Sequence, residues 1–554
     1  MRYFSSLLFI SPLLFSYCVF SAPLNPADRN EIQQRQAEVI EQAKQQRESL
    51  LQLNQTPARK AAHDDVGSEN CFPINEIQYR HASLLQAKDK KILNENYINR
   101  CINVNKINQL IHDVSNWYIE RGYITSRAFI SEQDLSDGVL RIDIMEGRLE
   151  YIRINNQSAR MLSQVFPGLE GEILNLRDIE QGMEQINRMP TQQVSIEILP
   201  GSRPGYSIVN LTRQKQLPLS VSLGFDNSGQ KSTGEQQLNG SLWADNLLGI
   251  ADQWFVSGGR SSKFSSGRNA ENLQTGVSLP YGYWNLSYDY ARSDYRNDFL
   301  NRDFLWRSTG DSQTHRLSLS RVIFRNGEMK TSLSAGMTHR IGHNYLNDVL
   351  LQSSSRKLSS AIIGISHSQK LWGGLATFNP AYSRGTHWFG AESDSGKSAD
   401  APRAEFNKLT LSASYYFPLA AGVGYLTSLY GQYSPQALYG SEQLTLGGES
   451  SVRGFKEQYI SGNRGGYWRN EVNWQAMRLP VLGDVTFTAA LDGGHLSAHQ
   501  HDSESVGTLW GAAVGAAIAN RHLSQQVMVG RPLDYPRWLK PDALSVYYRI
   551  GLSF

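Results

Sequence analysis

Two short stretches carry side chains of the kinds that enzymes and binding sites use. Residues 447–455, GGESSVRGF, place one arginine, Arg453, among small residues with no candidate base beside it. The GESSV part lacks the final glycine of a nucleophile elbow, and no strand–turn–helix pattern surrounds it, so a hydrolase triad has no anchor. We therefore predict no catalytic residue in this stretch, and the role of Arg453 depends on the elements that surround it.

The second stretch, AESDSGKS at residues 391–398, fits a permissive phosphate-loop pattern through Gly396, Lys397 and Ser398. A phosphate loop needs a buried strand before it and a helix after it, so that backbone amides face the phosphates. The following ADAPRAEF favours no helix. We therefore predict that the chain binds no nucleotide.

No other cluster predicts a cofactor. His63, Asp64 and Asp65 lie in a polar, breaker-rich segment that is typical of a flexible linker, so we expect no metal there. The net charge of +3, with 19% charged residues, argues against a concentrated basic face for nucleic acid.

The N-terminus predicts export from the cytoplasm. Residues 1–22 combine Arg2, an apolar run and small residues at Ser21 and Ala22, which together indicate a secretory signal. The alternative, a membrane anchor, is disfavoured because the apolar run is short and contains Pro12. Downstream, no run of about 18 apolar residues occurs, so a membrane role would require a β-barrel.

Cleavage of this signal would remove Cys18 and leave only Cys71 and Cys101. Disulfides persist in the compartments beyond the inner membrane. The sequence contains no CxxC and no Cys/His metal spacing, so we predict one disulfide between Cys71 and Cys101.

The mature chain begins with a polar helix over residues 25–54. Asn25 is a candidate N-cap, Pro26 stands at the first helical position and Asp28 lies in the first turn. The apolar residues of this segment are too sparse for a wide core-facing stripe, so the helix is expected in water or in a polar cavity. Residues 55–70 then predict a linker.

Two small α+β modules follow, at residues 71–148 and 149–215, each with the element order β-α-α-β-β. In the first, Ile107, Leu110, Ile111, Val114 and Tyr118 mark one helical face. Its segment RGYITSRAFISEQDLSDGVLRIDIMEGRL resembles the polypeptide-transport-associated (POTRA) domains that precede outer-membrane barrels.

From residue 217 to 554 the sequence alternates between apolar and polar positions. In the final segment Val546, Ile550 and Leu552 share one face, while Arg549 and Gly551 share the other. About 16 such segments, joined alternately by short and longer connections, predict a transmembrane barrel whose apolar face contacts lipid. A soluble β-sandwich is the alternative, but it would place fewer aromatic residues near strand ends.

The order of signal, helix, two POTRA-like modules, 16 strands and a VRGF-bearing sixth loop (residues 434–464) resembles the outer-membrane transporters of two-partner secretion, in the Omp85 superfamily. Among them, the transporters for haemolysins and contact-dependent growth-inhibition toxins are the most similar.

The resemblance implies a protein of the bacterial outer membrane, with its POTRA domains in the periplasm and the 25–54 helix as a plug. Its partner would be a large secreted exoprotein with an N-terminal secretion domain, exported unfolded and without ATP. Two alternatives remain: an insertase that assembles outer-membrane proteins, and a passive porin or receptor.

Strand parity and the resemblance together select a site. In the thirteenth strand, DVTFTAALDGG, Phe487 and Leu491 share the apolar face, so Asp492 must point into the lumen. The resemblance implies that the VRGF arginine meets the aspartate of an F-x-D-x-G motif, which here has Ala490 in place of phenylalanine. The residues expected in this site are Val452, Arg453, Gly454, Phe455, Asp492 and Gly494.

Overall fold

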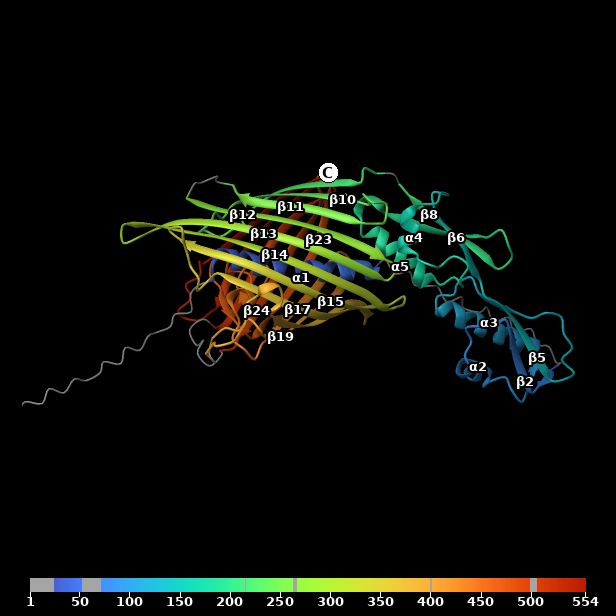
Figure 1. The fold of residues 1–554 in the computed structure, drawn as a ribbon. Coiled ribbons are helices and arrows are strands. Elements are labelled where there is room, and N and C mark those ends of the chain that lie inside the picture. The colour runs from blue at the N-terminus through green and yellow to red at the C-terminus, as the bar shows by residue number, and fades with distance from the viewer. Residues whose placement is uncertain (1–23, 52–70, 215, 263–266, 399–400, 499–505) are drawn as a thin grey trace, which may run out of the picture.

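The computed structural model describes residues 24–51, 71–214, 216–262, 267–398, 401–498 and 506–554. The expected signal at 1–22 and linker at 55–70, with His63, Asp64 and Asp65, lie outside these residues. Two small modules sit at one end of a large barrel, and an N-terminal helix lies inside the barrel (Figure 1). Among the described residues, no helix is both long and apolar enough to cross a bilayer.

The first module packs two helices against a three-stranded sheet with the order β2-β5-β4. Its elements are β1 (Cys71–Ile74), β2 (Glu76–Arg80), α2 (Ala87–Asn94), β3 (Arg100–Asn103), α3 (Val104–Glu120), β4 (Arg127–Phe129) and β5 (Val139–Met145). The predicted face of α3 is buried at Ile107, Leu110, Val114 and Tyr118. The side chain of Asn103 caps this helix by accepting the backbone N–H of Lys106.

The first module also contains a feature that the β-α-α-β-β prediction omits. Strands β1 and β3 form a separate two-stranded antiparallel sheet. Strands of four residues are too short to show a period-two pattern, which explains the omission. The predicted disulfide is confirmed here: Cys71 and Cys101 are joined across this small sheet, with their Cα atoms 5.3 Å apart.

The second module has the predicted order of elements. It comprises β6 (Arg148–Ile154), α4 (Arg160–Val165), α5 (Leu176–Asn187), the 3-10 turn η1 (Pro190–Gln192), β7 (Val194–Pro200) and β8 (Tyr206–Arg213). Its sheet has the order β6-β8-β7, with β6 parallel and β7 antiparallel to β8. Ile179 and Ile186 of α5 are buried in its core.

Polar and charged contacts fix the second module to the near end of the barrel. Glu184 of α5 accepts a hydrogen bond from Arg325 Nη1 at 2.6 Å and forms an ion pair with Lys330. Burial raises the pKa of the Glu184 carboxyl, but the attraction of Lys330 and Arg325 outweighs it and lowers the pKa to about 2. The hydroxyl of Thr191 also donates to Asp245 at 2.7 Å. The Glu184 carboxylate that anchors the module therefore stays charged at neutral pH.

The barrel is closed and antiparallel, and the predicted count of sixteen spanning strands is confirmed. The strands are β9 (Leu219–Asp226), β10 (Gln237–Asp245), β11 (Gln253–Ser261), β12 (Arg268–Tyr281), β13 (Trp284–Asn301), β14 (Phe304–Arg325), β15 (Met329–Leu346), β17 (Arg356–Leu371), β18 (Gly374–Thr386), β19 (Asn407–Ala420), β20 (Val423–Tyr433), β23 (Gly465–Leu479), β24 (Gly483–Leu496), β25 (Gly507–Ala519), β26 (Leu523–Asp534) and β27 (Ser545–Ser553). The two-residue β16 (Val349–Leu350) only extends the loop after β15.

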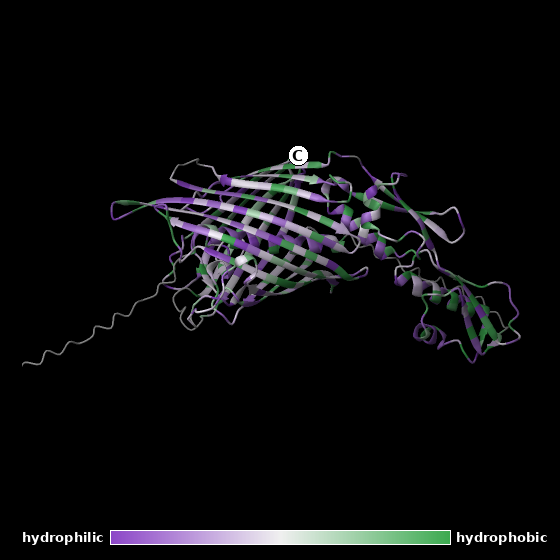
Figure 2. Ribbon diagram, in the orientation of Figure 1, coloured by the Kyte–Doolittle hydropathy of each residue, from purple (hydrophilic) through white to green (hydrophobic). Residues whose placement is uncertain are grey.

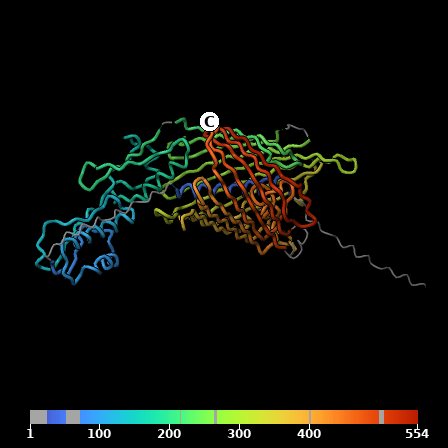
Figure 3. Tube along the Cα trace, turned by 180° about the vertical axis from the view of Figure 1, so that it is seen from behind, coloured from blue at the N-terminus to red at the C-terminus, as the bar shows by residue number. Residues whose placement is uncertain are grey.

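The barrel closes where the last strand meets the first. Strand β27 pairs with β9 from Arg549–Asp226 to Ser553–Ser222, and these strands lie side by side in the view from behind (Figure 3). The side chain of Asn227 continues the seam, because its amide donates to Val546 O and its carbonyl accepts from Tyr548 N.

Apolar and polar residues alternate along the wall, as the hydropathy colours show (Figure 2). On β27 the side chains of Val546, Ile550 and Leu552 are exposed on the outer surface, whereas Tyr547 is buried inside. Phe487 and Leu491 of β24 are exposed in the same way, while Asp492 is 0% exposed. The outer face therefore suits lipid, and the inner face suits polar contents.

The predicted N-terminal helix is α1 (Pro26–Leu51), and it lies in the barrel lumen (Figures 1 and 3). The Asn25 side chain accepts the backbone N–H of Asp28 at 2.8 Å, as expected of an N-cap. Buried positions of α1 include Arg29, Ile32 and Gln36. A helix this polar has no apolar stripe to bury, so ion pairs and amide contacts with the lumen hold it.

The Cys71–Cys101 bridge should stabilise the first module. The cysteines are 30 residues apart, and in the chain-entropy estimate the closed loop contributes about 3 kcal/mol. In the full-length protein, replacing both cysteines with serine should therefore speed amide hydrogen exchange across residues 71–145 and leave the second module as an unchanged internal control. Unaltered exchange in both modules, or free thiols in mass spectra of the mature wild type, would contradict this prediction.

Candidate functional site

Loop 6, residues 434–464 between β20 and β23, folds into the barrel instead of extending into solvent. It contains the 3-10 turn η3 (Gly440–Glu442) and a small hairpin of β21 (Leu444–Leu446) and β22 (Ile460–Gly462). Three apolar residues of the loop, Val452, Phe455 and Leu446, are at most 1% exposed. The VRGF tip, residues 452–455, is therefore fixed against the inner wall.

Arg453 and Asp492 form a buried, bidentate pair at this tip. Arg453 Nε donates to Asp492 Oδ2 and Nη2 donates to Oδ1, both at 2.6 Å, and the Arg453 backbone N–H also donates to Oδ2 at 3.1 Å. The two side chains are 1% and 0% exposed. One carboxylate thus binds both the guanidinium and the backbone of the loop tip.

Two further charges, which the sequence analysis missed, complete the site. Arg453 Nη1 lies 2.9 Å from Glu471 Oε1, and Arg469 Nη2 donates to the same oxygen at 2.9 Å. Arg469 also donates to the backbone oxygen of Glu449 in the loop, at 3.1 Å. Arg469 and Glu471 both lie on β23 beside Asp492, because Arg469 pairs with Asp492 across the ladder.

The two arginines and two carboxylates form a neutral cluster, which offsets the cost of burying each charge. A signal for the missed pair was available in the sequence. Arg469 and Glu471 occupy the same parity on a strand whose opposite parity carries Trp468, Val472 and Trp474. Two opposite charges, two positions apart on the lumenal face of the neighbouring strand, are candidate ion-pair partners for Arg453 and Asp492.

Glycines let the loop backbone lie directly on the wall. Gly454 has φ +101°, and a Cβ there would lie 2.7 Å from the Arg531 carbonyl. On the wall, a Cβ at Gly511 would lie 1.8 Å from Arg453 O, and one at Gly530 would lie 2.7 Å from Gly454 N. Gly454 was expected in this role, whereas no sequence pattern singled out Gly511 and Gly530.

The other expected residues surround the charge cluster. Val452 and Phe455 pack in one apolar cluster with Leu446, and the Phe455 ring meets the Tyr535 ring edge-on at 6.0 Å between centroids. Gly494 leaves room for Leu446, since a Cβ there would lie 2.8 Å from Leu446 Cδ1.

Ala490 stands where the resembled motif has phenylalanine. It pairs with Glu471 across the ladder. Its side chain packs against Ala513, Met528 and Tyr547 of the neighbouring strands. The ring of Tyr547 on β27 therefore lies in the same cluster as Ala490 and supplies an aromatic side chain there.

A second charge cluster holds α1 against the wall. Arg340 of β15 contacts Asp28 at 2.5 Å and Glu31 at 3.0 Å. Arg35 lies 3.8 Å from Glu442 of loop 6, which also forms an ion pair with Lys408 of β19. The three cations and three carboxylates balance. Loop 6 thus contacts both the wall and the helix.

The phosphate-loop-like stretch makes a different set of contacts. Lys397 Nζ donates at 2.9 Å to both Asp394 Oδ1 and Tyr439 OH. Asp394 also accepts the backbone N–H groups of Ala404 and Glu405. The lysine therefore ties the loop after β18 to loop 6. In the described ranges, no group of three or more His, Cys, Asp and Glu side chains is arranged to hold a metal ion.

Comparison with known proteins identifies the family. The family described as haemolysin secretion/activation protein ShlB/FhaC/HecB matches residues 205–518. A POTRA domain of the ShlB type matches residues 72–147, and a further POTRA domain matches residues 148–200.

Individual relatives match over nearly the whole length. The outer membrane transporter CdiB of Dickeya dadantii (strain 3937) is 66% identical over 540 residues, which cover 98% of this chain and 97% of that protein. The hemolysin transporter protein ShlB of Serratia marcescens is 31% identical over 534 residues, covering 95% and 94%. The solved structure of CdiB from Escherichia coli has 52% identity and a TM-score of 0.94, covering 97% of this chain and 100% of that one. With its barrel, paired POTRA modules and lumenal loop, this chain belongs to the ShlB/FhaC/HecB family of haemolysin secretion/activation proteins.

Proposed function

We propose that this protein is an outer-membrane transporter that takes one large, unfolded exoprotein from the periplasm and passes it through its barrel to the cell surface. The observation that carries the proposal is the combination, in one chain, of periplasmic POTRA modules, a polar lumen and a helix held in that lumen by ion pairs. Nucleotides are absent from the periplasm, so the step uses no ATP, and we assign it no catalytic residue.

The POTRA modules are suited to receive an extended chain. The sheets β2-β5-β4 and β6-β8-β7 each have two edge strands, and an unfolded segment can add a strand to such an edge through backbone hydrogen bonds. An N-terminal secretion domain of the exoprotein is the segment that we expect to bind there.

An insertase for outer-membrane proteins is the second candidate, and the closing seam is the observation that favours it. In the strand register β27 and β9 share five residue pairs, whereas β9 and β10 share eight. An insertase would open this seam toward lipid, while a transporter would use the lumen.

A secretion assay separates these functions. Cells that express this protein together with a candidate exoprotein should release the exoprotein to the medium, and cells with the exoprotein alone should retain it in the periplasm. If the exoprotein remains inside while the assembly of other barrels depends on this protein, the insertase function is correct and the transporter function is wrong.

The Arg453–Asp492 pair should be required for secretion. Removing either partner leaves one uncompensated charge in the buried cluster, at a cost of about 3–5 kcal/mol, so Arg453→Ala and Asp492→Ala should each reduce secretion sharply while the barrel still inserts. Because the two act as one unit, the double variant should be little worse than either single variant.

A matched control lies on β23 and β24, the strands that carry Glu471 and Asp492. Arg478 of β23 and Asp484 of β24 form a loose pair at 3.7 Å, with side chains 83% and 42% exposed. Exposed pairs contribute little, so Arg478→Ala and Asp484→Ala should secrete normally. Full secretion by Arg453→Ala, or strictly additive defects in the double variant, would refute the role of the buried pair.

Deleting residues 25–54 should raise ion conductance through the barrel in planar bilayers without preventing insertion, because α1 fills part of the lumen and contributes no outer surface. Removing only its anchors should act in the same direction. The anchor variant is Asp28→Ala/Glu31→Ala/Arg35→Ala, and its control is Glu41→Ala/Lys44→Ala/Glu48→Ala. The control residues are more than half exposed. Unchanged conductance after the deletion would show that α1 does not plug the pore.

A further inference from the structure

Helix α1 makes its side-chain contacts with wall strands on one half of the lumen, and near its N-terminus it also accepts hydrogen bonds from Gln230 in the β9–β10 connection. Its ion pairs with wall strands go to Arg316 of β14 and Arg340 of β15. Toward its C-terminus, Gln46 bonds to Ser366 of β17 and Asn379 of β18, and Arg47 donates to Ser414 of β19 at 2.6 Å. A cavity of about 350 Å³ on this side is lined by charged residues that include Arg340, Lys408 and Glu442.

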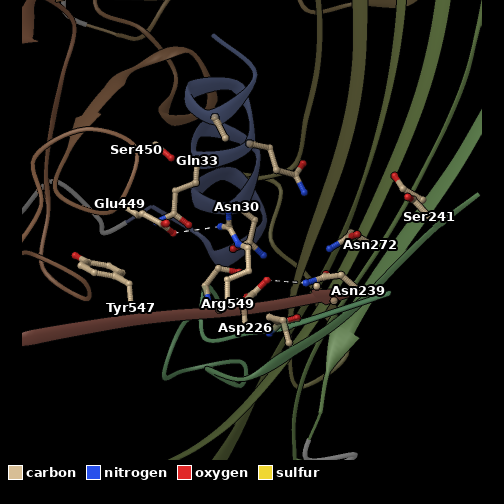
Figure 4. Close-up of a pocket in the computed structure, with 18 of the residues that line it drawn as sticks. Asn30, Gln33, Asp226, Asn239, Ser241, Asn272, Glu449, Ser450, Tyr547 and Arg549 are labelled. Atoms are coloured by element: carbon tan, nitrogen blue, oxygen red, sulfur yellow. Dashed lines mark hydrogen bonds and ion pairs between the residues drawn. The ribbon is translucent and has the colours of Figure 1, made fainter. Parts of the chain in front are cut away.

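The other half of the lumen is hollow. A cavity of about 740 Å³ lies between α1, the tip of loop 6 and the strands β9–β12 and β27. In Figure 4, Asn239, Ser241 and Asn272 on the strands face Asn30 and Gln33 on the helix across this space. Its volume falls in the range of specific ligand sites, about 300–1,000 Å³.

The wall of this cavity is chemically different from the opposite wall. Small or uncharged polar residues line it: Ser222 and Gly224 of β9, Asn239 and Ser241 of β10, Ser257 of β11, and Asn272 and Gln274 of β12. Asp226 is the charged residue that these four strands contribute, and the Asn239 amide donates to it at 2.9 Å. The remaining charges are Glu38 and Glu41 on α1, Lys456, and the Glu449–Arg549 pair at 3.3 Å.

Glycine keeps the wall flat at one point. A Cβ at Gly259 of β11 would lie 2.3 Å from Asn239 Oδ1, so a larger residue there would push the Asn239 side chain into the cavity. Next to it, the hydroxyls of Ser222 and Ser241 are hydrogen-bonded at 2.6 Å. The amide and hydroxyl groups of these side chains lie close to the backbone of the wall and line the cavity, where an extended chain can bond to them.

We propose that the β9–β12 wall is the binding track for the exported polypeptide, and that an extended segment enters the 740 Å³ cavity beside α1. This inference rests on the proposed function and names the part of the lumen that performs it. An extended chain occupies a cross-section of about 4.8 Å by about 10 Å, the spacings between strands and between sheets. With that cross-section, the cavity volume corresponds to roughly 15 Å of extended chain, or about four to five residues.

Charge explains why the track lies on this side. Once α1 leaves, Arg316 and Arg340 on the opposite wall are cations without the helix carboxylates Glu38, Asp28 and Glu31. Such a wall would retain acidic segments of a passing chain. Transport requires many weak contacts in place of a few strong ones, and neutral Ser, Asn and Gln side chains supply weak contacts to any sequence.

Two pairs of serines, each joined across neighbouring strands, allow a matched test. Ser241 pairs with Ser257 on the track, and Ser414 pairs with Ser428 on the opposite wall. Each serine is replaced singly by cysteine in the full-length transporter. The probe is the exoprotein that passes the secretion assay. It carries a single cysteine in each variant. It is fused to a domain that a disulfide keeps folded, so that the fusion stalls in the barrel. Disulfide adducts between the two proteins are then counted.

Adducts at Ser241→Cys and Ser257→Cys should exceed those at Ser414→Cys and Ser428→Cys by about tenfold, because the effective concentration of two tethered groups falls steeply with their separation. Equal yields on both walls, or an excess on the Ser414 side, would overturn the track while leaving secretion intact. If the stalled fusion forms no adduct at any of the four positions although the unfused exoprotein is secreted, the lumen is not the path and the track is wrong. A failure of the wild type to secrete any exoprotein would instead refute the proposed function.

As a second variant, Asn272→Trp should fill the track and lower the amount of secreted exoprotein severalfold without changing barrel insertion. Asn470→Trp places the same ring on the outer face of β23, where Trp468 and Val472 are already exposed, and should secrete normally. Normal secretion by Asn272→Trp would count against the track.

Discussion

The buried pair between Arg453 and Asp492 is the contact on which the organisation of the lumen depends. A loop of 31 residues, 434–464, would otherwise lie free inside or outside the barrel mouth. Asp492 binds both the guanidinium and the backbone N–H of Arg453, so a single carboxylate fixes the position and the orientation of the loop tip. Because both groups are desolvated, the loss of either leaves one uncompensated charge in the buried cluster.

The position of α1 follows from that of loop 6. Glu442 of the loop is shared between Arg35 on the helix and Lys408 on the wall, and the backbone oxygens of Lys456 and Thr445 accept hydrogen bonds from Arg29 and Gln36 of α1. The helix is thus held through polar contacts that water can replace, which is compatible with the plug role proposed for it. The Arg453 cluster is more enclosed, which suits an element that stays.

Asymmetry is the consequence for the lumen. The loop and the helix gather most of their ionic contacts on β14, β15, β19, β23 and β24, whereas the cavity lining on β9–β12 carries Asp226 as its charged residue. The second POTRA module is fixed below the barrel by Glu184, Arg325 and Lys330. A chain delivered by the modules therefore meets a lumen with one charged side and one neutral side.

The sequence alone determined the spanning strands of the barrel, because period-two alternation marks them and parity fixes which side chains face inward. The sequence pattern also placed Asp492 in the lumen. Because only Cys71 and Cys101 lie outside the predicted signal, it predicted a single disulfide between them. Only the tertiary structure decided which groups meet. Arg469 and Glu471 join the pair through the β23–β24 register, and Gly511 and Gly530 matter because the loop backbone lies on them. Such contacts join residues that local patterns treat as independent, so closure of the barrel and the inward fold of loop 6 had to be known first.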